Sequence, residues 1–197
     1  FIVSAPSGAG KTTLCRMLTQ RLKAIEHSVS YTTRKPRPGE VDGRDYYFVD
    51  EKHFMELVHK GEFIEWAEVH GNLYGTSKTK LTERIQKGID VILDIDTQGA
   101  RQIREKEIDA TFVFVLPPSM EVLRERLQNR RSDSEEVIRR RLAKAVEEIA
   151  DYKYYDYVII NDKLDEAFEE LKAIVLSRRV RIDSVDHQWI ERQFLKR

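Results

Sequence analysis

The chain has 197 residues, enough for one domain with a substantial core and inserted subdomains. Its 34 basic side chains balance 34 acidic ones, so no overall field favours a nucleic-acid or membrane-surface partner. Uninterrupted apolar runs are too short to span a membrane, and the single Cys15 is predicted to be a small buried hydrophobe in a reducing, cytoplasmic protein.

The chain opens with an apolar strand, a loop of small residues and the start of a helix, and we expect further chain before Phe1 because the strand is already under way there. The loop reads Ser4-Ala5-Pro6-Ser7-Gly8-Ala9-Gly10-Lys11-Thr12. Small residues let backbone N–H groups close around phosphate oxygens, and the helix adds its positive N-terminal end. Lys11 is expected on the β- and γ-phosphates and the Thr12 hydroxyl on Mg²⁺, although the pattern asks for glycine where Ala5 stands. The loop predicts nucleotide binding; a glycine-rich turn that only caps a helix is the alternative.

The next elements follow from hydrophobic periodicity and from turn residues. Apolar residues at helical spacing predict a helix over residues 11–23. We then expect strands over residues 27–32, 46–49 and 63–69, a helix over residues 51–60, and a turn at Gly71-Asn72. This middle part is turn-rich and polar, and it interrupts the alternation of strands and helices as an inserted substrate domain would.

Alternation resumes at Leu81. We expect a helix over residues 81–87, and then apolar strands, buried on both faces, over residues 91–96, 112–116 and 157–160. Strands separated by helices imply right-handed crossovers and a parallel sheet covered on both sides. We therefore predict an α/β fold with five core strands, near residues 1, 27, 91, 111 and 157. The loop should meet Asp94 and Asp96 at the carboxyl ends of these strands, where such sheets bind ligands.

Arginines crowd the segment that follows. Ser132 and Glu135 predict a capping box that starts a helix over residues 135–150, and on their own its arginines read as a solvated face. A last helix is expected over residues 165–179. Beyond it the pattern fades, and Trp189 with Phe194 is expected to pack on the core or on a second subunit.

Several stretches match the motifs of one family in order and spacing, over most of the chain. They are Ala5-Pro6-Ser7-Gly8-Ala9-Gly10-Lys11-Thr12, Ser30-Tyr31-Thr32-Thr33-Arg34, Pro36-Arg37-Pro38-Gly39-Glu40, Gly43-Arg44-Asp45-Tyr46-Tyr47-Phe48, Phe63-Ile64-Glu65-Trp66-Ala67, Tyr74-Gly75-Thr76, Ile92-Leu93-Asp94-Ile95-Asp96-Thr97-Gln98-Gly99 and Ile159-Ile160-Asn161-Asp162. The chain resembles the guanylate kinases, which move the γ-phosphate of ATP onto GMP. The resemblance implies a P-loop kinase fold whose five-stranded parallel sheet has helices on both faces. It implies three parts: a core (residues 1–32, 82–125 and 156–197), an inserted mixed α/β GMP-binding subdomain (residues 33–81) and a helical lid (residues 126–155).

The resemblance also implies how ATP and Mg²⁺ are held. The ATP-binding residues would be Ser7, Gly8, Ala9, Gly10, Lys11, Thr12, Thr13 and Asn161. Asn161 would contact adenine, with a turn-forming asparagine as the alternative. Thr12 would ligate Mg²⁺ directly and Asp94 through water. The five histidines are scattered and show no metal-ligand spacing.

GMP, or dGMP, would be bound at its phosphate and at its base. The implied residues are Ser30, Arg34, Arg37, Tyr46, Glu65, Tyr74, Thr76 and Asp96. Guanidinium forks and phenol hydroxyls suit the phosphate, which assigns it to the arginines and tyrosines. A carboxylate at Glu65 can accept from the N1 and 2-amino donors of guanine, whereas adenine has an acceptor at N1 and would repel it. Ser30 and Thr76 would address O6 or its surroundings, and Asp96 the amino side.

Phosphoryl transfer needs alignment and positive charge around the migrating group. By resemblance the catalytic residues are Lys11, Arg34, Arg37, Arg130 and Arg141. Arg131 stands where the family usually has glycine, which leaves open which of Arg130 and Arg131 faces the phosphates. Two alternatives remain: a non-catalytic guanylate-kinase-like interaction module, which Lys11 and the lid arginines disfavour, and a P-loop kinase of another monophosphate. The expected partners are the two nucleotides, with no nucleic acid or membrane, in a monomer or homodimer.

Overall fold

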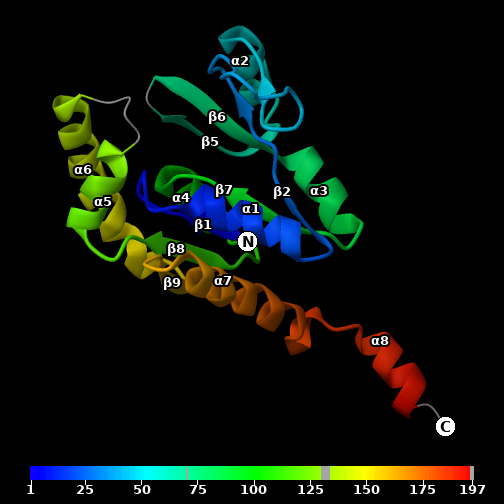
Figure 1. The fold of residues 1–197 in the computed structure, drawn as a ribbon. Helices are drawn as coiled ribbons and strands as arrows, with labels where there is room; N and C mark the ends of the chain where they lie inside the picture. Colours follow the sequence, from blue (N-terminus) through cyan, green and yellow to red (C-terminus); the bar gives the residue numbers. More distant parts are fainter. Residues whose placement is uncertain (70, 130–133, 196–197) are drawn as a thin grey trace.

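The computed structural model describes residues 1–69, 71–129 and 134–195 and contains two sheets (Figure 1). The larger sheet has five strands in the order β2-β7-β1-β8-β9, all paired in parallel. These strands are β1 (Ile2–Ser4), β2 (Ile25–His27), β7 (Asp90–Asp94), β8 (Phe112–Leu116) and β9 (Tyr157–Ile160). The predicted α/β fold with a five-stranded parallel sheet is confirmed.

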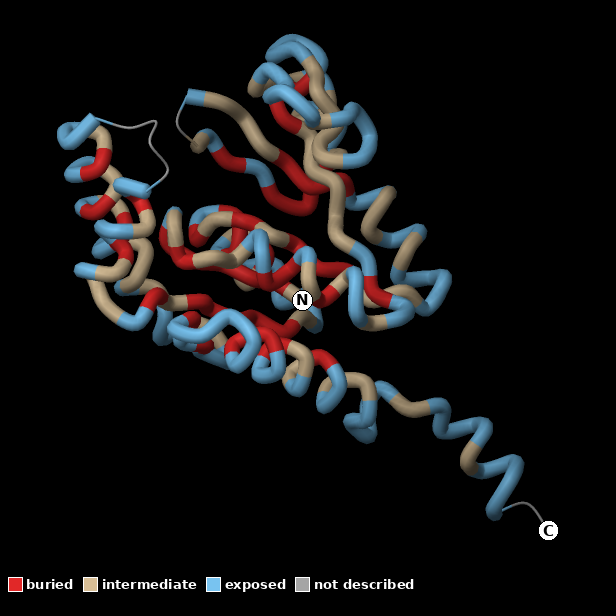
Figure 2. Tube along the Cα trace, viewed as in Figure 1, coloured by how far each residue is buried: buried red, intermediate tan, exposed pale blue. Residues whose placement is uncertain are grey.

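Burial within this sheet follows strand position. The central strands β1, β7 and β8 are apolar because helices cover both of their faces, and Figure 2 shows them as the buried centre of the molecule. The prediction that residues 157–160 are buried on both faces is wrong. Of β9 only Ile159, which packs in the cluster formed with α7, is buried, whereas Val158 and Ile160 alternate to the opposite face and are exposed.

Helices on both faces of the sheet complete two hydrophobic clusters. On one face, α1 (Lys11–Arg21) and α7 (Leu164–Arg179) pack Leu14, Leu18 and Phe168 against β1, β7, β8 and β9. On the other, α4 (Thr97–Glu105) packs Ala100 and Ile103 against the same sheet, with α3 (Lys78–Gln86) beside it. Cys15 lies fully buried in the first cluster, where burial raises the pKa of its thiol, so the prediction of a buried hydrophobe is confirmed.

The smaller sheet has the order β4-β3-β6-β5 and carries α2 (Glu51–His59). Its strands are β3 (Tyr31–Thr32), β4 (Tyr47–Phe48), β5 (Phe63–Val69) and β6 (Asn72–Ser77). The single strand predicted over residues 27–32 is wrong, because the chain leaves the larger sheet at His27 and enters the smaller one at Tyr31. Strand β6 was not predicted, since Gly75 interrupts its pattern and its order comes from pairing with β5 and β3.

Two further helices, α5 (Met120–Gln128) and α6 (Glu135–Ile149), pack on each other through a small apolar cluster. The residue that caps α6 is Ser134, whose side chain accepts from Val137 N, and the predicted cap Ser132 lies outside the described residues. Likewise α3 starts at Lys78, earlier than expected, because Ser77 accepts from Lys80 N. A 3₁₀ turn (Ala150–Tyr154) then leads into β9.

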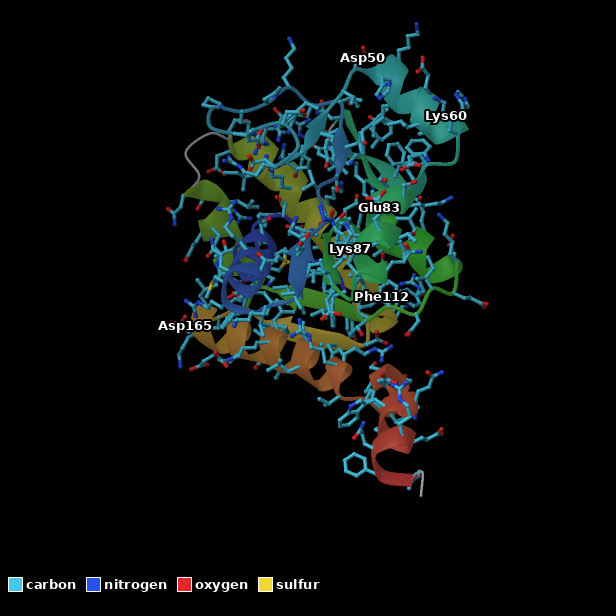
Figure 3. The ribbon with its side chains drawn as sticks, turned by 90° about the vertical axis from the view of Figure 1, so that its right-hand side faces the viewer. Asp50, Lys60, Glu83, Lys87, Phe112 and Asp165 are labelled. Carbon is cyan, nitrogen blue, oxygen red and sulfur yellow. The ribbon has the colours of Figure 1, made fainter. Side chains whose placement is uncertain are left out.

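The C-terminal segment leads away from the body of the molecule (Figure 1; Figure 3 shows it on the far side from Asp50 and Lys60 of the α2 region). It contains a 3₁₀ turn (Ile182–Ser184), α8 (His187–Ile190) and a π-helical turn (Glu191–Leu195). Trp189 and Phe194 pack on each other, with ring centroids 5.7 Å apart, and both stay exposed. The expected packing on the core is therefore absent from the described chain. Within its described ranges, the chain has no helix both long and apolar enough to cross a membrane.

Candidate active site

A cavity of about 340 Å³ lies between the two sheets and α6. The predicted site residues that line it are Ser7, Gly8, Gly10, Lys11, Thr12, Thr13, Ser30, Tyr46, Glu65, Tyr74, Asp94, Asp96 and Arg141. Ala9, Arg34, Arg37, Thr76 and Asn161 do not line it, and Arg130 lies outside the described residues. A second cavity of about 440 Å³ is lined by Phe1, Leu81, Ile103 and Arg178, and no predicted site residue reaches it.

The loop of residues 4–12, the phosphate loop, connects β1 to α1. Gly8 and Gly10 have φ values of 100° and 97°, in the left-handed region that disfavours side chains, and Gly10 caps α1. Asn161 donates from Nδ2 to the Ala9 carbonyl at 2.7 Å, and a Cβ at Gly10 would lie 2.2 Å from that nitrogen. Ala5 has no positive φ and is buried in the core, so alanine is tolerated where the pattern asks for glycine.

Lys11, Thr12 and Asp94 form a hydrogen-bonded group at the carboxyl end of β7. Lys11 Nζ lies 2.7 Å from Asp94 Oδ1 and donates to the Ile95 carbonyl at 2.7 Å, and Thr12 Oγ1 donates to Asp94 Oδ2 at 2.9 Å. Burial alone would raise the pKa of Asp94, but Lys11 and His27 hold it well below its usual value. Burial would lower the pKa of Lys11, but the attraction of Asp94 outweighs it, so both groups are charged.

This group presents oxygen donors of the kind that Mg²⁺ binds. A hydroxyl and a carboxylate are hard ligands, and Mg²⁺ in kinases takes few protein ligands and completes its shell with phosphate oxygens and water. Across the described residues there is no cluster of three or more His, Cys, Asp or Glu placed to hold a metal ion. Thr12 and Asp94 offer one hydroxyl and one carboxylate, which fits the small number of protein ligands that Mg²⁺ takes in kinases.

Glu65 on β5 is the most deeply buried acid of the cavity, with 4% of its surface exposed. Its Oε1 accepts from Thr76 Oγ1 at 2.5 Å. Burial raises the pKa of Glu65 to about 7, and the nearby charge of Asp96 adds to the effect, while Thr76 and Lys106 oppose it. Asp96 caps α4 by accepting from Gly99 N at 2.9 Å, so two carboxylates face one region of the cavity.

Arg34 has its guanidinium beside the tyrosines but paired with an acid of its own segment. Its NH2 group donates to both oxygens of Glu40 at 2.8 and 3.0 Å, and Arg37 N donates to the same carboxylate at 2.7 Å. The guanidinium carbon lies 5.4 Å from the ring centroid of Tyr46. A guanidinium that binds a carboxylate can also bind a phosphate.

The guanylate kinase family model matches residues 1–178. The chain belongs to the guanylate kinase family. It is 55% identical over 181 residues to a guanylate kinase of Geobacter metallireducens, a match that covers 92% of this chain and 89% of the relative. It is 52% identical over 185 residues to a guanylate kinase of Vibrio cholerae, covering 93% of this chain and 89% of that protein.

A solved structure is similar as well. The crystal structure of guanylate kinase from Anaplasma phagocytophilum matches with a TM-score of 0.78 and 35% identity, over 100% of this chain and 95% of that one. As a member of the guanylate kinase family, the chain is a nucleoside monophosphate kinase with a P-loop kinase fold.

Beside the predicted residues, the fold of this guanylate kinase family member brings others to the site that sequence reasoning missed. His27 Nε2 lies 3.9 Å from Asp94 Oδ2. The position of His27 at the end of a strand is the sequence feature that could have indicated this contact. From α6, Lys144 and Glu148 line the cavity with Arg141, at helical spacing, with 3.7 Å between Lys144 Nζ and Glu148 Oε1. Arg126 donates to the Asn161 carbonyl at 2.8 Å and so supports the phosphate loop from α5; no local pattern marks that contact.

Proposed function

We propose that the chain transfers the γ-phosphoryl group of ATP to GMP, and also to dGMP, by in-line attack in the presence of Mg²⁺, giving ADP and GDP. The observation that carries the proposal is the pairing of a phosphate loop with a buried acid, Glu65, in one cavity. The first suits the polyphosphate of a donor, and the second suits a base that offers two adjacent N–H donors.

ATP would be held by the backbone N–H groups of the phosphate loop and by Lys11. On binding, Lys11 exchanges part of its bonding to Asp94 and Ile95 for the β- and γ-phosphates, and it is already charged and close by. Ser7, Gly8, Ala9, Gly10 and Thr13 complete this side. Asn161 supports the phosphate loop by binding the Ala9 carbonyl, and it would also contact adenine.

Mg²⁺ would be bound by Thr12 directly and by Asp94 through water, and when bound it neutralises charge on the phosphates. Asp94 is suited to this because its carboxylate stays ionised, held by Lys11 and by the Thr12 hydroxyl.

GMP would place its base against Glu65 and Asp96 and its phosphate near Tyr46 and Tyr74. The Glu65 carboxylate accepts from N1 and the 2-amino group, while Thr76 and Ser30 stand by O6 or its surroundings. Arg34 and Arg37 then hold the phosphate. Because a polar site rejects a base that leaves its buried groups unpaired, discrimination against AMP is on the order of 10⁴ or more.

Transfer itself would depend on positive charge brought around the migrating group. Lys11 stays on the phosphoryl group, Arg34 and Arg37 hold the acceptor, and Arg141 and Arg130 approach from the lid. Such charges lower the barrier by stabilising the developing charge, and no general base is required. The three-part division into a core, a GMP-binding subdomain over residues 33–81 and a lid over residues 126–155 belongs to this proposal. So do the cytoplasmic setting and the monomeric or homodimeric state.

The proposal is tested by coupled measurement of ADP release with ATP and Mg²⁺ against GMP, dGMP, AMP and UMP. Turnover that depends on GMP and dGMP, with neither AMP nor UMP replacing them, supports it. Turnover with AMP or UMP at a comparable kcat/KM would assign the chain to another monophosphate.

A further inference from the structure

The outer edge of β5 is held by side chains of α4. Strand β5 is an edge strand that pairs with β6 alone, and Figure 1 shows α4 beneath it. Gln102 of α4 accepts from Trp66 N at 3.2 Å through Oε1 and donates to the Trp66 carbonyl at 2.6 Å through Nε2. Its amide thus takes the place of a neighbouring strand. Lys106, the residue that caps the C-terminal end of α4, donates from Nζ to the Ile64 carbonyl.

These contacts fall on both sides of one residue. The Ile64 carbonyl belongs to the peptide group before Glu65, and Trp66 N belongs to the peptide group after it. The two peptide groups that flank Glu65 are therefore bound by α4 and by its C-terminal cap residue. Within the described strands of the smaller sheet, Glu65 is the one acid that lines the cavity.

An irregularity in the pairing of β5 with β6 also helps to orient the Glu65 side chain. The register of β5 against β6 shifts between Phe63 and Glu65, and Ile64 packs into the cluster of the larger sheet with Ile95 and Ile103. Such bulges redirect side chains beside functional sites. Here the shift anchors Ile64 in the core while Glu65 faces the cavity, bonded to Thr76.

Helix α4 also leaves the room that the carboxylate occupies. A Cβ at Gly99 would lie 2.4 Å from Glu65 Oε2, so only glycine at this position permits the observed placement of the carboxylate. One turn later, Gln102 binds the backbone of Trp66. The carboxylate and its backbone are thus both fitted to one helix.

We propose that Gln102 is a positioning residue for recognition of the acceptor base: by clamping Trp66 it fixes the Glu65 carboxylate over Gly99, where it meets the two N–H donors of guanine. The inference rests on the proposed function, because it assumes that Glu65 binds guanine. Functional groups must be held to within about half an ångström to act at full strength, and an unclamped edge strand would not do so.

The test compares binding of GMP and IMP, measured by titration calorimetry on the full chain. IMP has the N1–H donor of guanine but lacks the 2-amino group, so it reports whether the carboxylate still meets both donors. Gln102→Leu removes both hydrogen bonds to Trp66 at similar side-chain size. We expect it to raise the Kd of GMP about fivefold, the effect of a lost hydrogen bond. The Kd of IMP should rise less, and that of ATP should not change.

A second variant acts on the carboxylate without touching the clamp. In Gly99→Ala the added methyl meets the end of the flexible Glu65 side chain, and alanine favours the helix, so the fold is retained. We expect it also to lower the preference for GMP over IMP. Glu105→Gln, at an exposed position of α4, is the matched control and should bind both nucleotides as the unchanged chain does.

Glu65→Gln, measured in the same way, distinguishes a failure of the positioning role of Gln102 from a failure of the base-binding role of Glu65. If Glu65→Gln weakens GMP but Gln102→Leu leaves its Kd unchanged, or weakens GMP and IMP equally, the positioning role is overturned and the proposed function stands. If Glu65→Gln leaves the Kd of GMP unchanged, the role of Glu65 fails and the role of Gln102 fails with it.

Discussion

Glu65→Gln should stabilise the ligand-free protein at neutral and alkaline pH while it removes base recognition. Glu65 is buried with a pKa raised from 4.5 to about 7, so its folded environment disfavours the carboxylate. Each pKa unit corresponds to about 1.4 kcal/mol, so the ionised side chain costs the folded state about 3 kcal/mol. Glutamine keeps an oxygen for the Thr76 hydroxyl and carries no charge.

The pH dependence of this effect has a definite sign. Because Glu65 binds a proton more tightly in the folded than in the unfolded chain, the folded state retains full stability below pH 4.5 and loses stability as the pH rises through 7. The variant lacks this titration. The free energy of unfolding of the variant minus that of the unchanged chain should therefore grow by about 2 kcal/mol between pH 5 and pH 8.

The assay is urea unfolding of both proteins at the two pH values, without nucleotide. Groups that titrate in both proteins cancel in the difference, so the comparison isolates Glu65. A difference that is the same at pH 5 and pH 8 would refute the argument that burial governs this carboxyl. As a control, GMP at a hundredfold excess over its Kd should stabilise the unchanged chain by about 3 kcal/mol and the variant far less.

Three other substitutions probe the phosphate side. Lys11→Ala should lower kcat about 10³-fold, since the lysine charge stabilises the transferring phosphoryl group, while circular dichroism should show a folded chain. A near-normal kcat would contradict the catalytic role of Lys11. Arg141→Ala should lower kcat and kcat/KM together by about 10²-fold, because in the proposed role its charge acts mainly in the transition state, and a loss confined to KM would reassign it to substrate binding. Asp94→Asn should raise the Mg²⁺ concentration for half-maximal rate about tenfold, and an unchanged Mg²⁺ titration would remove Asp94 from the metal site.

The local sequence specifies some elements of the fold and not others. Strand β5 was predicted at its observed bounds, because its apolar run lies between turn residues. Strand β6 was not, because Gly75 serves a distant contact: a Cβ there would lie 3.0 Å from the Phe63 ring. The break between β2 and β3 was missed for a similar reason, since the two strands have different partners.

The same division holds for the candidate site. Motif residues such as Lys11 and Glu65 could be predicted because their chemistry is visible in the residue type and spacing. Some residues that support the site could not be predicted, because their contacts leave no pattern in the sequence. Glu40 binds Arg34 across a turn, whereas Gln102 binds the backbone of Trp66 from another element, and neither contact leaves a periodic pattern.

If Glu65 selects GMP as the acceptor, the ratio of kcat/KM for GMP to that for AMP should depend on its carboxylate. That ratio should be measured with saturating ATP and Mg²⁺ for the unchanged chain and for Glu65→Gln. We expect a ratio on the order of 10⁴ or more in the unchanged chain and a fall of at least about tenfold in the variant. A ratio that is the same in both proteins would contradict it.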